Sequence, residues 1–201
     1  MCANCKKHIQ KYPNTRCFLC NRLLVSWRCS APCELAKIKQ YIVAEREGLA
    51  HGVIDGMKFG YARANATVCA ELLHESATML EGDAVIVPVP TSAPHIRQRG
   101  FDHTLLIAKR LAKMRKTRAA SLLGRSHNER QVGAGRKQRF LQANAAFFAK
   151  PTQPKTTSVI LLDDIITTGS TTAAAARCLQ EAGYVVEGII AVAHQPLEKR
   201  K

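Results

Sequence analysis

Two adjacent carboxylates and a cluster of hydroxyl side chains lie within the segment VILLDDIITTGST, which spans residues 159–171. A turn rich in Thr, Gly and Ser that opens a helix presents backbone N–H groups without intrahelical acceptors, and the helix dipole favours an anion there. Gly169 permits close approach of the backbone. The hydroxyl donors are Thr167, Thr168, Ser170 and Thr171. This turn predicts a phosphate site, and the acids Asp163 and Asp164 suit sugar hydroxyls or a metal ion, so we expect a ribose 5-phosphate.

The surrounding residues predict the elements that hold this turn. Val159 to Leu162 is apolar and predicts a buried parallel strand that ends at the two acids. An Ala-rich helix is predicted from about Ser170 to Ala182, closed by Gly183. The acids and hydroxyls could merely cap this helix, but a cap needs only one such residue. No Gly-Lys-Ser/Thr follows, so the segment is not a Walker A loop.

The segment resembles the phosphoribosyl pyrophosphate (PRPP) motif of type I phosphoribosyltransferases at every position. The resemblance implies that residues 167–171 anchor the 5-phosphate. Asp163 and Asp164 would then be catalytic, holding the ribose hydroxyls directly or through Mg²⁺ while pyrophosphate leaves. A pyrophosphate loop is expected at the turn formed by Pro88, Val89, Pro90 and Thr91, which would offer backbone N–H groups to pyrophosphate. Cations that would close over the pyrophosphate are Arg125, Arg130, Arg136, Lys137 and Arg139.

Paired cysteines near the start predict a metal site. The pairs are Cys2 with Cys5, Cys17 with Cys20, and Cys29 with Cys33. Such spacing is typical of the knuckles of a tetrahedral zinc ribbon, and three pairs speak against a redox Cys-x-x-Cys. We favour Cys17, Cys20, Cys29 and Cys33 as Zn²⁺ ligands, with Cys2 and Cys5 as alternative partners of the central pair. His8 could complete a poorer second site with Cys2 and Cys5. Cys69 and Cys178 are expected to be small core residues.

The net charge of +15 is concentrated, because residues 97–139 carry thirteen Lys or Arg against two acids. A basic surface of this size attracts polyanions, so single-stranded DNA is a candidate partner. The candidate cations for nucleic acid or a flexible loop are Arg97, Arg99, Arg125, Arg136, Lys137 and Arg139. The alternative is that these cations serve a small polyphosphate. No apolar run suits membrane insertion and no signal peptide is evident, so a cytoplasmic location is expected.

Strands and helices alternate along the rest of the chain and predict an α/β domain with a parallel sheet. Residues 34–50 are expected to be a linker, and residues 52–60 a short apolar segment with a turn. Helices are expected at 61–80 and 102–115, and a long loop at 125–142. The other expected strands are 84–89, 121–123 and 184–193. Ligands of such sheets bind at the carboxyl ends of strands, where Asp163 and Pro90 fall.

Further segments resemble the ComF family, which joins a zinc ribbon to a type I phosphoribosyltransferase-like domain. The matching residues lie in Gly56–Gly60, Val87–Pro90, Arg99–His103, Gln131, Arg139, Asn144 and Ala146–Phe147. The resemblance implies two domains, a ribbon at 1–40 and a phosphoribosyltransferase-like domain at 41–201. It also implies natural competence, with cytoplasmic handling of single-stranded DNA and contacts to competence proteins. Asp102 and His103 replace the usual amide pair of that family.

Two functions remain open from the sequence. In one, the chain handles nucleic acid and binds PRPP or a nucleotide in the phosphate turn. In the other, it is an active phosphoribosyltransferase of nucleobase or nucleotide salvage. The sequence offers no evident general base and no nucleobase pocket, so it does not distinguish a working phosphoribosyltransferase from a binding protein.

Overall fold

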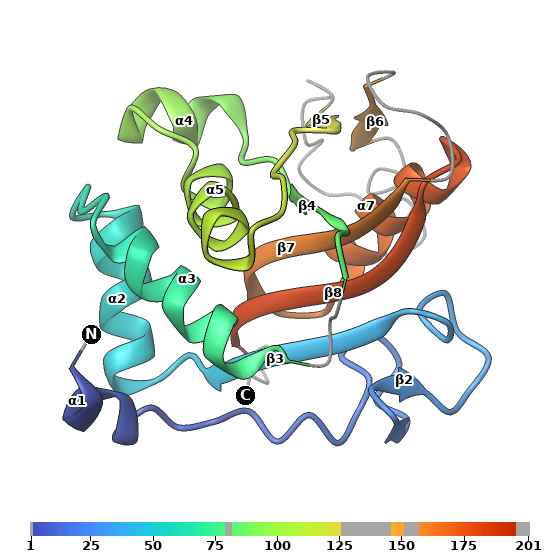
Figure 1. The fold of residues 1–201 in the computed structure, drawn as a ribbon, viewed down its shortest axis with the longest axis horizontal. Helices are drawn as coiled ribbons and strands as arrows, with labels where there is room; N and C mark the ends of the chain where they lie inside the picture. Colours follow the sequence, from blue (N-terminus) through green and yellow to red (C-terminus); the bar gives the residue numbers. More distant parts are fainter. Residues whose placement is uncertain (1, 79–81, 126–145, 151–156, 196–201) are drawn as a thin grey trace, which may run out of the picture.

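A four-stranded parallel sheet forms the centre of the computed structural model, which describes residues 2–78, 82–125, 146–150 and 157–195 (Figure 1). Its strands are β3 (Lys39–Glu45), β4 (Val85–Pro88), β7 (Ser158–Ile166) and β8 (Val185–His194). They are ordered β3-β8-β7-β4. This arrangement confirms the expected α/β class with a parallel sheet flanked by helices, and the expected strands at 84–89 and 184–193.

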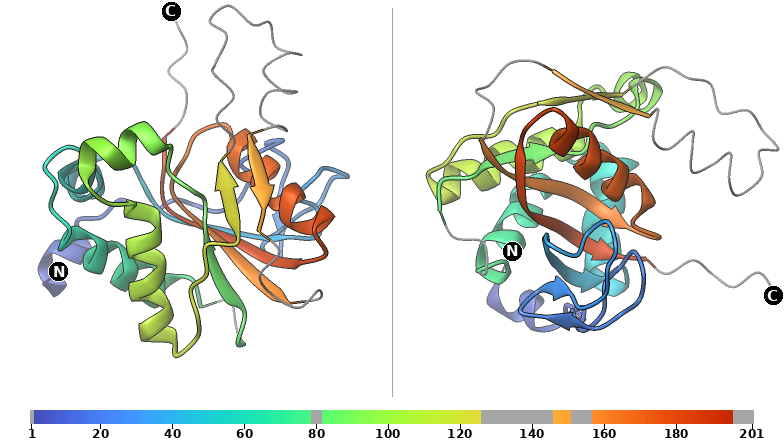
Figure 2. Two further views of the ribbon diagram at one scale, coloured as in Figure 1. Left: turned by 90° about the horizontal axis from the view of Figure 1, so that it is seen from above. Right: turned by 90° about the vertical axis from the view of Figure 1, so that its right-hand side faces the viewer.

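Helices cover both faces of this sheet. One face is covered by α2 (Gly48–Lys58), α3 (Asn65–Ser76) and α5 (His103–Arg115), whose apolar side chains form one core cluster with Ile160 and Leu162 of β7. The other face is covered by α7 (Ser170–Glu181), which packs with Val159 and Leu161. Figure 2 shows α7 across the sheet from α5. Alternate residues of β7 therefore enter different cores, as the two-residue repeat of a strand requires.

Two helices and a small antiparallel strand pair follow β4, the strand at one edge of the sheet. The short helix α4 (Ala93–Arg99) follows β4, and α5 comes next with Asp102 as its N-cap, accepting a hydrogen bond from the Leu105 N–H at 3.2 Å. The antiparallel pair β5 (Leu123–Arg125) and β6 (Phe147–Ala149) lies beside them. The expected helix at 102–115 is thus confirmed, and the short strand expected at 121–123 lies two residues later.

The N-terminal region holds α1 (Ala3–Lys7), β1 (Leu24–Val25) and β2 (Arg28–Cys29). We refer to residues 16–33 as the ribbon. Its side chains are not separate from the main core, because Phe18, Leu19 and Cys33 pack against the cluster that includes α7. Leu35 and Ile38 are buried in that same cluster.

Two expected segments are wrong in type. Residues 34–50 are not only a linker, because they contain β3, whose Ile42, Val43 and Ala44 are buried. Residues 52–60 are not an apolar segment with a turn, because most of them belong to α2. Ala50, Ile54 and Met57 are spaced as one face of a helix, and all three are buried. Their packing stabilises α2 despite the two glycines in its interior. The helix expected at 61–80 is shorter, and α1 and α4 were not expected.

The strand before the phosphate turn is longer than expected. β7 continues through Ile166 and pairs Asp163 with Ala191 and Ile166 with His194 of β8. The two acids are therefore inside the strand rather than after its end. Hydrogen bonds of the sheet override the weak strand preference of Asp at these positions.

Candidate functional site

The predicted phosphate turn is present at the N-terminus of α7. Gly169 is the N-cap, with φ of 73°, a left-handed conformation that favours glycine. Around it, the hydroxyl side chains of Thr167, Thr168, Ser170 and Thr171 are exposed. The hydroxyls of Thr168 and Ser170 are 2.9 Å apart. Thr171 also lines a cavity at this edge of the sheet. The first turn of the 12-residue helix thus offers N–H and O–H donors to an anion.

Asp163 and Asp164 have different surroundings because they point to opposite faces of β7. Asp163 lies on the α7 face, where Oδ2 is 3.3 Å from the Thr172 hydroxyl and Oδ1 accepts the Asp164 N–H at 2.9 Å. Asp164 lies on the other face, where Oδ2 forms an ion pair with Lys58 Nζ and lies 3.1 Å from His103 Nε2. Both residues are buried, since only 8% of the surface of Asp163 and 5% of that of Asp164 is exposed.

These surroundings separate the ionisation of the two carboxyls. Burial raises the pKa of Asp163 well above its usual value, and the negative charge of Asp164 adds to the rise. Burial would also raise the pKa of Asp164, but the hydrogen bond from His103 and the charge of Lys58 outweigh it and lower that pKa well below its usual value. The pair therefore combines one charged carboxylate with one carboxyl that resists ionisation until a cation or donor arrives.

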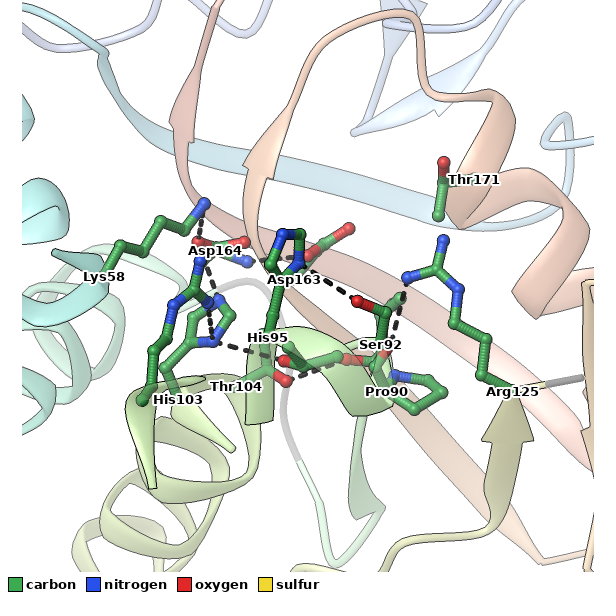
Figure 3. A pocket seen from close by; sticks show the side chains of 13 residues that line it. Lys58, Pro90, Ser92, His95, His103, Thr104, Arg125, Asp163, Asp164 and Thr171 are labelled. Atoms are coloured by element: carbon green, nitrogen blue, oxygen red, sulfur yellow. Dashed lines mark hydrogen bonds and ion pairs between the residues drawn. The ribbon is translucent and has the colours of Figure 1, made fainter. Parts of the chain in front are cut away.

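Both acids line one cavity of about 180 Å³ at the carboxyl edge of the sheet (Figure 3). Thr171 lies at one end of the view and Lys58 at the other. The basic side chains that line it are Lys58, His95, Arg99, His103 and Arg125. Such a concentration of cations beside two acids suits a ligand with several phosphate oxygens and a polar sugar.

The end of β4 contributes less backbone than expected. Val89, Pro90 and Thr91 line the cavity. The prolines have no N–H, and the Val89 N–H is bonded to the Leu162 carbonyl at 2.8 Å. Of the four residues of this loop, only Thr91 therefore keeps an N–H group that these constraints do not remove.

The candidate cations occupy different environments. Arg97 is exposed on α4, whereas Arg99, at the end of the same helix, is only 9% exposed and lines the cavity. Arg125 is the last residue of β5, with Nη1 3.5 Å from the Pro90 carbonyl and its guanidinium 5.5 Å from the Phe147 ring centre. Arg136, Lys137 and Arg139 lie outside the described residues. Arg99 thus suits a small ligand in the cavity better than an extended polyanion.

The four favoured cysteines form a candidate metal site. The Sγ atoms of Cys17, Cys20, Cys29 and Cys33 all lie within 4.8 Å of one another, close enough to share one ion. Within the described residues they are the only such group of three or more, so the proposed second site with His8 is not assembled. Cys2 and Cys5 form a separate pair, with sulfurs 3.3 Å apart at α1. Cys69 is buried as expected, and Cys178 partly so.

Three basic side chains of the cavity were not assigned a role from the sequence: Lys58, His95 and His103. Lys58 stands at the end of the unexpected helix α2, so its direction could not be inferred. His103 was noted only as a departure from a family pattern. The local sequence does contain a hint that His103 lies close to Arg99. The two residues flank a turn that contains Gly100, and His103 is the first residue of a helix whose N-cap is Asp102.

Comparison with known proteins gives only distant likenesses. No protein-family model matches the chain, and no curated protein matches it. Solved structures of similar shape include the UMP synthase of Leishmania donovani, at 15% identity over 71% of this chain and 24% of that one, with a TM-score of 0.44. Another is the orotate phosphoribosyltransferase of Aeropyrum pernix, at 19% identity over 65% of this chain and 60% of that one, with a TM-score of 0.43.

The adenine phosphoribosyltransferase of Saccharomyces cerevisiae is similar at 18% identity over 66% of this chain and 68% of its own, with a TM-score of 0.40. The chain thus spans about a quarter of the synthase and less than two thirds of the orotate enzyme.

None of the helices in the part of the chain that the structure describes is both long and apolar enough to cross a lipid bilayer.

Proposed function

We propose that the chain binds PRPP or a nucleotide through its ribose 5-phosphate. The main support for this proposal is that Asp163, Asp164 and Thr171, the last at the N-terminus of α7, line the same cavity. The turn of α7 would hold the 5-phosphate, and the two acids would hold the ribose hydroxyls. The side chains of Lys58, Arg99 and Arg125 would meet pyrophosphate oxygens, in place of the backbone donors that β4 does not supply.

Magnesium fits this proposal as a companion of the ligand. Asp163 and Asp164 provide the carboxylate oxygens that Mg²⁺ prefers. Lys58 already neutralises Asp164, so we expect the acids to hold Mg²⁺ firmly only together with pyrophosphate oxygens. The ion would there neutralise charge on the leaving pyrophosphate.

Calorimetry with ribose 5-phosphate and with PRPP, each with and without Mg²⁺, tests the site. Thr171→Val keeps the shape of the side chain but removes a donor beside the cavity, so its affinity for both ligands should fall. A loss on the order of tenfold is expected for a hydrogen bond to a phosphate. Inorganic phosphate serves as the comparison ligand. If wild type binds neither sugar phosphate at millimolar concentration, the proposal is wrong.

A working phosphoribosyltransferase is the second candidate, favoured by His95. Partial burial and the positive charges of Arg99 and Arg125 lower the pKa of His95, so its imidazole is neutral near pH 7. A neutral imidazole that lines the cavity can accept a proton from an incoming nucleobase. Pyrophosphate release from PRPP with a panel of nucleobases tests this. Absence of release despite PRPP binding would favour the binding role.

For the cellular role, we propose a ComF-like protein of natural competence that handles incoming single-stranded DNA. It rests on the ribbon, the site and the net charge of +15. Exposed cations in the described part of the basic region include Arg97, Lys109, Lys113, Lys116 and Arg118. DNA affinity should fall steeply with salt, by roughly 0.7 log units per log unit of salt for each phosphate contacted.

Neutralising Arg136, Lys137 and Arg139 together should weaken DNA binding and flatten its salt dependence, with little change in sequence preference. If these cations serve only pyrophosphate, PRPP affinity should fall and DNA binding should stay unchanged. Deletion of the gene should lower transformation frequency if the competence role is right. Normal transformation would exclude that role and leave the binding site itself untouched.

A further inference from the structure

Four side chains from four elements, three of them buried and Lys58 partly buried, form a continuous series of contacts along the cavity. Arg99 of α4 contacts His103 of α5, with Nη1 and Nδ1 3.0 Å apart. The other ring nitrogen of His103, Nε2, is 3.1 Å from Asp164 Oδ2 of β7. Lys58 of α2 contacts that same carboxylate oxygen. His103 is only 4% exposed, so its ring is committed to these partners rather than to water.

The partners determine which nitrogen of His103 carries the proton. A guanidinium can only donate hydrogen bonds, so Nδ1 must accept from Arg99. The proton therefore resides on Nε2, which donates to the Asp164 carboxylate. The Thr91 hydroxyl, 3.2 Å from Nδ1, has Asp102 Oδ1 as its own acceptor at 3.0 Å.

We infer that His103 is a positioning residue that bridges two side chains, with Nδ1 accepting from Arg99 and Nε2 donating to Asp164. The bridge fixes the orientation of the one carboxylate of the pair that stays charged, and it anchors the Arg99 side chain at the cavity wall. Its role toward a ligand rests on the proposed ribose 5-phosphate site, but the state of its ring does not.

A glutamine side chain offers the same pair of functions. Its carbonyl oxygen can accept from Arg99, while its NH₂ group donates to Asp164. A leucine of similar bulk can do neither and would leave a buried carboxylate with one donor fewer. His103→Gln and His103→Leu therefore separate the bridge from simple packing. His74→Leu replaces an exposed histidine of α3 and serves as the matched control.

The test combines calorimetry with ribose 5-phosphate and ¹⁵N spectroscopy of the histidine rings, with the His103 signals assigned by their loss in His103→Gln. We expect His103→Leu to lose roughly tenfold or more in affinity, and His103→Gln to stay near wild type. Equal affinity in a folded His103→Leu, or an equal loss in both variants, would overturn the inference.

The spectroscopy decides the question even if no sugar phosphate binds, an outcome that would count against the proposed function alone. Because Nδ1 accepts from Arg99, we expect the hydrogen of the His103 ring on Nε2 and none on Nδ1. A proton on Nδ1 contradicts the bridge. This readout also stands if His103→Leu does not fold, because it uses wild type and the glutamine variant.

Discussion

The aromatic ring of Phe18 packs directly against Gly169, so the ribbon touches the phosphate turn. A Cβ built at residue 169 would lie 2.4 Å from Cδ2 of Phe18 and 3.4 Å from the Phe18 carbonyl oxygen. Phe18 follows Cys17, one of the four clustered thiols. The conformation of the turn therefore depends on the ribbon, a contact that local sequence patterns do not predict.

Gly169→Val should destabilise the fold and abolish binding of ribose 5-phosphate. A residue other than glycine in the left-handed conformation lowers the free energy of unfolding by about 1–2 kcal/mol, and the steric clash with Phe18 lowers it further. The added side chain meets Phe18, so the turn or the ribbon must shift. Thermal unfolding and calorimetry check this. Phe18→Ala should recover part of the stability lost in Gly169→Ala, as a double-mutant cycle would show. Unchanged affinity in Gly169→Val would refute the argument.

Removal of the ribbon's metal should weaken ribose 5-phosphate binding as well as unfold the ribbon. Elemental analysis should find about one zinc per chain, as expected for a closed four-thiolate site. Cys17→Ser should lose the metal and, through Phe18, the order of the phosphate turn. Cys2→Ser is the matched control and should keep both, because Cys2 lies outside the cluster. Full zinc content in Cys17→Ser would contradict this site.

Asp163→Asn should stabilise the ligand-free protein at neutral and alkaline pH while weakening the site. The pKa of Asp163 is raised on folding by burial, so its contribution is full below the unfolded pKa of about 3.9 and is lost as pH rises through the folded value. Asparagine stays neutral and removes that loss. Each 1 kcal/mol gained should raise Tm by about 2–4 °C. Melting curves across pH test this, and an unchanged pH dependence would argue against it.

Lys58→Met should destabilise the protein at neutral pH, because Asp164 would remain buried with His103 as its main partner. Breaking a buried ion pair by removing one partner costs about 3–5 kcal/mol. The pKa of Asp164 is lowered by His103 and Lys58 despite burial, so wild type keeps this contribution above the unfolded pKa and loses it only in strong acid. Denaturant unfolding measures the effect. Asp164→Asn in the same background should recover much of the loss, whereas additive losses would speak against the pairing.

Local sequence determined much of the chemistry and the main elements. The acids, hydroxyls and Gly169 lie in one uninterrupted segment, so the phosphate turn and the helix α7 could be predicted from local spacing alone. The same holds for the four cysteines, because paired thiols at short spacing leave few arrangements for one ion. The strong apolar runs of β4, β7 and β8 likewise predict a parallel sheet.

The tertiary structure decided which side chains surround that chemistry. Lys58, Arg99 and His103 come from three helices, and only the folded arrangement brings Lys58 and His103 to Asp164 and Arg99 to His103. Continued pairing with β8 keeps Asp163 and Asp164 in a strand, which turns them to opposite faces and so gives them opposite shifts in pKa. Charge and burial act through space rather than along the chain, so residues sixty or more positions apart set the ionisation of a pair that the sequence alone shows as equivalent.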